Sequence, residues 1–62
     1  MNDPRQRWQV WCIDGPATKV VATGNENAMR IRAENLSLSA RRHGIDLQYE
    51  ALPAPQRPEV TP

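Results

Sequence analysis

The sequence predicts a small α+β domain in which two strands, one helix and a third strand follow one another along the chain. Three patterns support this prediction. Apolar and polar residues alternate over 7–14 and again over 45–52, which is the period of a strand with one buried face. Between them, residues 26–42 place apolar side chains at helical spacing. The order of these patterns predicts the fold class ββαβ.

The first predicted strand carries both tryptophans of the chain, three residues apart. Side chains of a strand point alternately to its two faces, so positions three apart lie on opposite faces unless a β-bulge intervenes. We therefore expect Trp8 to enter the core together with Val10 and Cys12. Trp11 and Ile13 then lie on the outer face of the sheet. An aromatic ring as large as that of Trp11 indicates that this surface is covered, by another part of the chain or by a partner.

A turn and a second strand follow. The turn, residues 14–17, contains Gly15, which tolerates unusual backbone angles, and Pro16, whose own φ angle is fixed. Sequence rich in β-branched residues resumes over 19–23, so we expect the two strands to pair as a hairpin.

The start of the helix has two competing caps. Thr23 and Glu26 have the spacing of a capping box, whereas Asn25 caps a helix that begins later. We favour Asn25, because Gly24 is unfavourable within a first helical turn. The helix then extends to about residue 42 or 43 and ends at Gly44, a favoured residue just beyond a helix C-terminus.

The predicted helix has an apolar stripe and, on nearly the opposite side, an apolar pair. The stripe, which we expect to pack on the sheet, consists of Met29, Ala33, Leu36 and Ala40. The pair is Ile31 and Leu38, seven residues apart among polar neighbours, and it resembles one half of a helix–helix contact. Single exposed apolar residues are also normal on any surface. Exposure without function, or cover by the C-terminal tail, therefore remains the alternative for this pair.

The third strand is predicted over 45–52, where Ile45, Leu47, Tyr49 and Ala51 alternate with polar residues. From Pro53 onward, four prolines in ten residues exclude a helix or a central strand and predict an extended or disordered tail. The chain thus divides into a flexible lead-in over 1–5, one domain over 6–52 and a proline-rich tail over 53–62.

The connection through the helix constrains the topology. A right-handed crossover from the second strand to the third places the third beside the first. This predicts a three-stranded antiparallel sheet in the order 2-1-3, with the helix on one face and the face of Trp11 without an element to cover it.

Length, charge and cysteine content limit the function classes. A chain of 62 residues builds one domain with a modest core, so self-association or a partner is expected. The net charge of +1 indicates neither nucleic-acid nor membrane binding. The single Cys12 excludes an internal disulfide, and the N-terminus lacks the apolar run of a signal peptide. We expect a cytoplasmic protein, of the size common among bacterial and phage accessory proteins.

Chemical motifs are scarce. Cys12 and His43 are single residues far apart, whereas metal sites need three or four ligands, so no metal or cofactor is predicted. A nucleophilic pair of these two residues lacks an orienting group, and a fold this small leaves little room for a cleft. Catalysis is therefore not expected.

The leading hypothesis is a non-catalytic protein-interaction module, homodimeric, that acts as an accessory or regulatory protein. Its interface residues are Trp11 and Ile13 on the sheet, with Ile31 and Leu38 as a second surface. The alternative is a nucleic-acid-binding accessory protein, in which a base stacks on Trp11. Its candidate contacts are Arg7, Trp11, Lys19, Arg30, Arg41 and Arg42. Acidic residues at Asp46 and Glu50 on the face of Trp11 oppose phosphate binding and favour a protein partner. A small enzyme is the third and weakest hypothesis.

Overall fold

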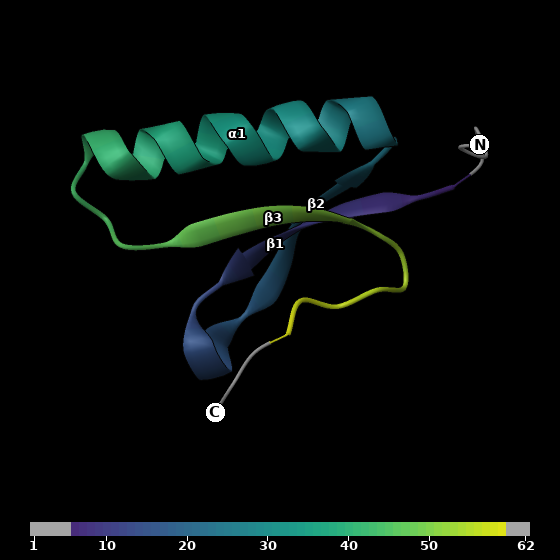
Figure 1. Ribbon diagram of the computed structural model, residues 1–62, viewed down its shortest axis with the longest axis horizontal. Coiled ribbons are helices and arrows are strands. Elements are labelled where there is room, and N and C mark those ends of the chain that lie inside the picture. The colour runs from purple at the N-terminus through teal and green to yellow at the C-terminus, as the bar shows by residue number, and fades with distance from the viewer. Residues whose placement is uncertain (1–5, 60–62) are drawn as a thin grey trace.

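A computed structural model of the chain describes residues 6–59 and confirms the predicted element order and topology (Figure 1). Strands β1 (Trp8–Ile13), β2 (Lys19–Gly24) and β3 (Gln48–Pro53) form an antiparallel sheet in the order β2-β1-β3. A short 3₁₀ helix, η1 (Gly15–Ala17), links β1 to β2. Helix α1 (Glu26–Arg42) lies across one face of the sheet. None of the helices in this part of the chain combines the length and the apolar composition needed to cross a membrane.

The core lies between α1 and the sheet. Val10 is fully buried at its centre, and Met29 and Ala33 of the predicted stripe pack over it. Half-buried side chains from every strand and the helix complete the cluster: Trp8, Ala22, Leu36, Tyr49 and Ala51. Cys12 and Ala40 are also buried, which confirms the inward position of Cys12 and the helix stripe, while Trp8 packs against the core half-buried.

The N-terminus of α1 is capped by Asn25, as the sequence predicted. Its side-chain oxygen accepts a 2.8 Å hydrogen bond from the backbone N–H of Ala28, and its backbone is extended. This bond satisfies one of the N–H groups that a helix leaves without a partner at its start.

The C-terminus of α1 explains why β3 begins later than predicted. Gly44 has φ +66°, and its N–H donates to the carbonyl of Arg41 at 3.1 Å. The next N–H, of Ile45, reaches back to the carbonyl of Ala40 at 2.8 Å. This pair of bonds is the Schellman motif. Because the backbone of Ile45 completes the helix end, the strand begins at Gln48 rather than at Ile45.

Strand β1 keeps its alternation over its whole length, because its register with β3 has no shift. Its register with β2 shifts once. Val10 lies opposite Ala22 and Trp11 lies opposite Val20, which leaves Val21 as the extra residue of a β-bulge in β2.

Pro53, predicted to begin the tail, is instead the last residue of β3; residues 54–59 contain neither helix nor strand, and the chain reverses direction there. The Ala54 N–H donates to the carbonyl of Arg7 at 2.8 Å, and the Gln56 N–H donates to that of Pro53, also at 2.8 Å. This turn includes the cis peptide bond between Ala54 and Pro55. Residues 56–59 then run back beneath the sheet, on the side away from α1 (Figure 1). The predicted lead-in over 1–5 and the last tail residues, 60–62, lie outside the described residues.

Candidate interaction surfaces

The outer face of the sheet presents an apolar patch centred on Trp11. Because Val10 and Cys12 are buried toward α1, the intervening Trp11 lies on the opposite face. Ile13 follows on that face, and Val20 lies directly across from Trp11 in β2. Leu52 belongs there too, because it alternates with the inward Ala51 on β3. We call Trp11, Ile13, Val20 and Leu52 the Trp11 face.

Two members of the Trp11 face were not predicted. Val20 belongs to it because the bulge at Val21 in β2 makes Val20 the residue across from Trp11. No sequence signal places a bulge at this position. Leu52 had such a signal, since it shares its alternation with the outward Gln48 and Glu50, but it stood at the predicted end of the strand.

Trp11 is half-buried, and its indole N–H is in an unusual state. The Nε1 atom is shielded from solvent and has no hydrogen-bond partner among the described residues. Most buried polar groups in folded proteins have a partner. A buried donor without one costs about 1–3 kcal/mol of stability. The indole N–H of Trp11 is therefore a buried donor without an acceptor in the described part of the chain.

The second predicted surface lies on the side of α1 that faces away from the sheet. Ile31 is 52% exposed and Leu38 is 47% exposed. The tail was an alternative cover for them, but its described part passes on the other side of the sheet (Figure 1). We call Ile31 and Leu38 the helix seam, which is uncovered in the part of the chain that the structure describes.

Four of the basic residues named for nucleic-acid contact do not share the sheet face of Trp11: Lys19, Arg30, Arg41 and Arg42. Arg30 is engaged within the fold: Nη2 lies 2.7 Å from Glu26 Oε2, and the guanidinium lies 5.4 Å from the centre of the Trp8 ring. Lys19 lies across from Cys12 and so belongs to the sheet face opposite Trp11. Arg41 and Arg42 lie at the C-terminal end of α1, in the other layer of the fold.

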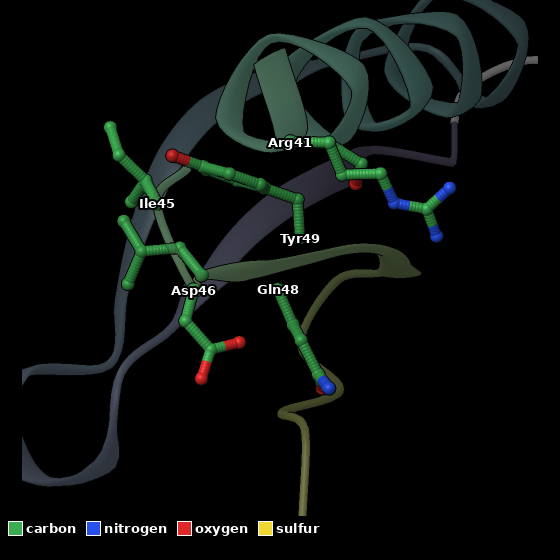
Figure 2. Close-up of a pocket in the computed structure, with 7 residues that line it drawn as sticks. Arg41, Ile45, Asp46, Gln48 and Tyr49 are labelled. Atoms are coloured by element: carbon green, nitrogen blue, oxygen red, sulfur yellow. The ribbon is translucent and has the colours of Figure 1, made fainter. Parts of the chain in front are cut away.

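A hollow of about 390 Å³ lies between the C-terminal half of α1 and the start of β3 (Figure 2). The sequence predicts that so small a fold leaves little room for a cleft, so a hollow of this size was not expected. Its lining comes from three consecutive stretches of structure: Ser37 and Arg41 on α1, Ile45, Asp46 and Leu47 on the loop, and Gln48 and Tyr49 on β3.

The polar ends of these lining side chains diverge. Figure 2 shows the guanidinium of Arg41 directed away from the hydroxyl of Tyr49, while the carboxylate of Asp46 and the amide of Gln48 extend to the far side of β3. General acid–base or nucleophilic chemistry needs groups within hydrogen-bond distance of a common reacting atom. The arrangement offers no such point.

Cys12 and His43, the two residues considered for nucleophilic chemistry, have separate surroundings. Cys12 is buried beside Tyr49, whose pKa is raised above its ordinary value by burial and also by the neighbouring thiol. His43 is exposed at the helix end, with Nδ1 2.8 Å from the carbonyl oxygen of Ser39. Among residues 6–59, His, Cys, Asp and Glu side chains form no cluster of three that could hold a metal ion.

Comparison of the chain with protein-family models, with curated proteins and with solved structures gives no significant match.

Proposed function

We propose that this chain is a non-catalytic protein-interaction module that associates with a second copy of itself through the helix seam. The observation that supports this most is the exposure of Ile31 and Leu38, seven residues apart on α1, with no described segment over them. Because each side chain is already about half buried, covering the rest stabilises an association by about 1 kcal/mol each.

Charge favours one orientation of the two helices. An antiparallel pairing about a two-fold axis near residues 34 and 35 places Ile31 against the partner's Leu38, and Leu38 against the partner's Ile31. In the same register Arg42 lies against the partner's Asn27. A parallel pairing instead places Glu34 and Arg42 each against its own copy, which brings like charges together. The antiparallel arrangement is self-complementary, as a two-fold interface must be.

The expected dimer is weak. Helix α1 has 17 residues and is therefore about 25 Å long. One face of such a helix buries less than the total of about 1,600 Å² that is usual for a stable complex. Association should therefore depend on concentration in the micromolar to millimolar range.

Light scattering coupled to size exclusion, together with sedimentation equilibrium, tests this proposal. We expect the average mass of the wild-type chain to rise toward that of a dimer with concentration. Leu38→Ser or Ile31→Ser should raise the dissociation constant at least about tenfold, because each copy of the dimer loses the burial of one apolar side chain. Ile45→Ser is the matched control, because Ile45 is 50% exposed but lies outside the seam. A wild-type chain that stays monomeric at millimolar concentration contradicts the proposal.

A module of this kind acts as an accessory or regulatory protein. The buried, unpaired Cys12 supports a reducing compartment such as the cytoplasm. Nucleic-acid binding has less support, because Arg30 is engaged with Glu26 and Trp8, and Trp11 is half-buried rather than an open platform for a base. Affinity for a single-stranded oligonucleotide that falls steeply with salt would favour that alternative.

A further inference from the structure

We infer that the Trp11 face binds an extended, proline-rich segment of another protein that carries a basic residue. In the free chain, the described part of the tail occupies this face as an intramolecular ligand. The helix seam lies on the opposite side of the fold, so this inference and the proposed dimer can fail independently.

The tail is anchored at the edge of the Trp11 face. The backbone of Ala54 is held at both of its polar groups: its N–H donates to the carbonyl of Arg7 at 2.8 Å, and its carbonyl accepts from Gln6 Nε2 at 2.7 Å. The hydrogen bond from the Gln56 N–H to the Pro53 carbonyl then closes the turn. The chain leaves this turn beneath the sheet (Figure 1).

The length of the tail brings Pro58 to the level of the Trp11 ring. The turn begins at Pro53, which lies across from Trp8 at the start of β1. Extended proline-rich chain advances about 3.1 Å per residue, so the two steps from Gln56 to Pro58 cover about 6 Å. That distance equals about two residues along β1, from Trp8 to Val10, which is the neighbour of Trp11. Pro58 is half-buried, although the residues on either side of it are exposed.

The described part of the tail runs on the side of the sheet that Trp11 faces (Figure 1), and it supplies no acceptor for the indole N–H. The indole N–H of Trp11 is shielded from solvent and has no acceptor among the described residues, those of the tail included. Aromatic surfaces that bind proline-rich segments combine ring contact with the prolines and hydrogen bonds to carbonyls that a left-handed polyproline helix exposes. A segment that places one carbonyl at Nε1 gains a bond that the tail does not make. The tail is therefore a replaceable occupant.

Charge specifies the ligand further. Glu50 lies directly across from Trp11 on β3 and is exposed. The tail carries Arg57 next to Pro58, and within residues 6–59 the Arg57 guanidinium makes no ion pair with Glu50. A bound segment with arginine among its prolines gains attraction to Glu50, whereas an acidic segment is repelled.

Titration of a proline-rich peptide, followed by the indole N–H signals in nuclear magnetic resonance, tests the site in the full chain. The probe is acetyl-Pro-Pro-Pro-Arg-Pro-Pro-Pro-amide. The chain has two tryptophans, and Trp11→Phe assigns their signals by removing one of them. We expect the Trp11 signal to shift with peptide, while that of Trp8, which packs in the core, stays in place.

Three variants give expected changes in the dissociation constant. Pro58→Gly loosens the competing tail and should lower the apparent constant at least about threefold, since a ligand binds only the unoccupied fraction. Glu50→Lys should raise it about two- to fivefold, as for the loss of an exposed ion pair. Arg32→Glu, a charge reversal at an exposed position of α1 outside the helix seam, should leave it unchanged. Trp11→Phe keeps a ring but removes the donor, and it should raise the dissociation constant about two- to tenfold. Binding to this variant is measured by tyrosine fluorescence and by amide chemical shifts.

Several results overturn the inference. The docking surface is excluded if millimolar peptide leaves the Trp11 signal in place in both the wild type and Pro58→Gly. Equal dissociation constants in these two chains exclude occupation by the tail. A peptide with glutamate in place of arginine that binds equally well excludes the basic preference. A last control combines Pro58→Gly with Leu38→Ser, which removes the dimer through the helix seam. If this double variant still dimerises without peptide, and the Trp11 signal shifts as it does so, the face binds the tail of a second copy instead.

Discussion

The guanidinium of Arg30 lies 5.4 Å from the centre of the Trp8 ring, while its Nη2 stays 2.7 Å from Glu26. The ring of Trp8, which belongs to β1, is thus in contact with the guanidinium of Arg30 on α1. The ion pair fixes the long arginine side chain, and the ring attracts its positive charge. One residue of α1 therefore joins the helix to the first strand, which explains why a ring at the open end of the sheet is only half-exposed.

Arg30→Ala should lower the free energy of unfolding by about 1 kcal/mol, the sum expected for one exposed cation–π contact and one helical ion pair. Arg30→Lys should lose about half of this, because an ammonium group does not stack on the ring. Arg32→Ala, an exposed arginine two residues along the helix, is the control and should change stability by less than about 0.5 kcal/mol. Urea denaturation measures all three, and equal losses at both positions would contradict the role of Arg30.

The element order and sheet topology could be predicted because each depends on a local period or a chirality rule. Alternation in β1 and helical spacing in α1 are properties of side chains, which a sequence shows directly. Right-handed crossover then leaves one topology for the third strand. The opposite faces of Trp8 and Trp11 follow from the same alternation, and the unbroken register with β3 confirms them.

The remaining features depend on backbone hydrogen bonds that side-chain patterns do not report. Ile45 continues the alternation of β3, yet its N–H completes the end of α1, so pattern and structure disagree there. The bulge at Val21 exchanges the residue opposite Trp11 without a glycine to mark it. The path of the tail depends on a bond between Ala54 and Arg7, which are far apart in sequence.

Asn25→Ala should lower the free energy of unfolding by about 1 kcal/mol, because the Ala28 N–H loses its side-chain acceptor at the helix start. Asn25→Asp should retain this stability, since a carboxylate caps equally well and interacts favourably with the helix dipole. Asn27→Ala is the control, because Asn27 is the second residue of α1 and is exposed. Thermal unfolding followed by circular dichroism gives the comparison, and a loss at Asn27 as large as that at Asn25 would count against the cap.

Gly44→Ala should lower the free energy of unfolding by about 1 kcal/mol through the backbone alone. The φ of +66° is unfavourable for a residue with a Cβ atom, while an added Cβ would meet no atom within 4 Å. Gly44→Asn should lose less, because asparagine tolerates this conformation better than alanine does. If alanine and asparagine destabilise equally in urea, the conformational explanation is wrong.

Val10→Ala should be the most disruptive of the conservative changes, at about 2 kcal/mol. Val10 is 0% exposed at the centre of the core, so two methyl groups of buried contact are lost and a cavity remains. Val21→Ala is the matched control, because Val21 is 40% exposed at the bulge and should change stability by less than about 0.5 kcal/mol. If the two variants unfold at the same urea concentration, the placement of Val10 at the centre of the core is wrong.

The raised pKa of Tyr49 predicts a loss of stability in alkaline solution. Its hydroxyl keeps its proton in the folded chain to a higher pH than in the unfolded chain, where the value is near 10.0. The protonated hydroxyl of Tyr49 therefore makes its full contribution to the free energy of unfolding below about pH 10. This contribution is lost as the pH rises toward the folded-state pKa. Tyr49→Phe has no such group, so its stability should fall less steeply above about pH 10 than that of the wild type. Urea unfolding at a series of pH values measures the difference.

The thiol of Cys12 also contributes to the shift in the pKa of Tyr49. A Cys12→Ala background should therefore make the difference smaller but not abolish it, because burial is the larger cause. Parallel stability curves for the wild type and Tyr49→Phe up to pH values well above that of free tyrosine would show that the fold does not hold this proton.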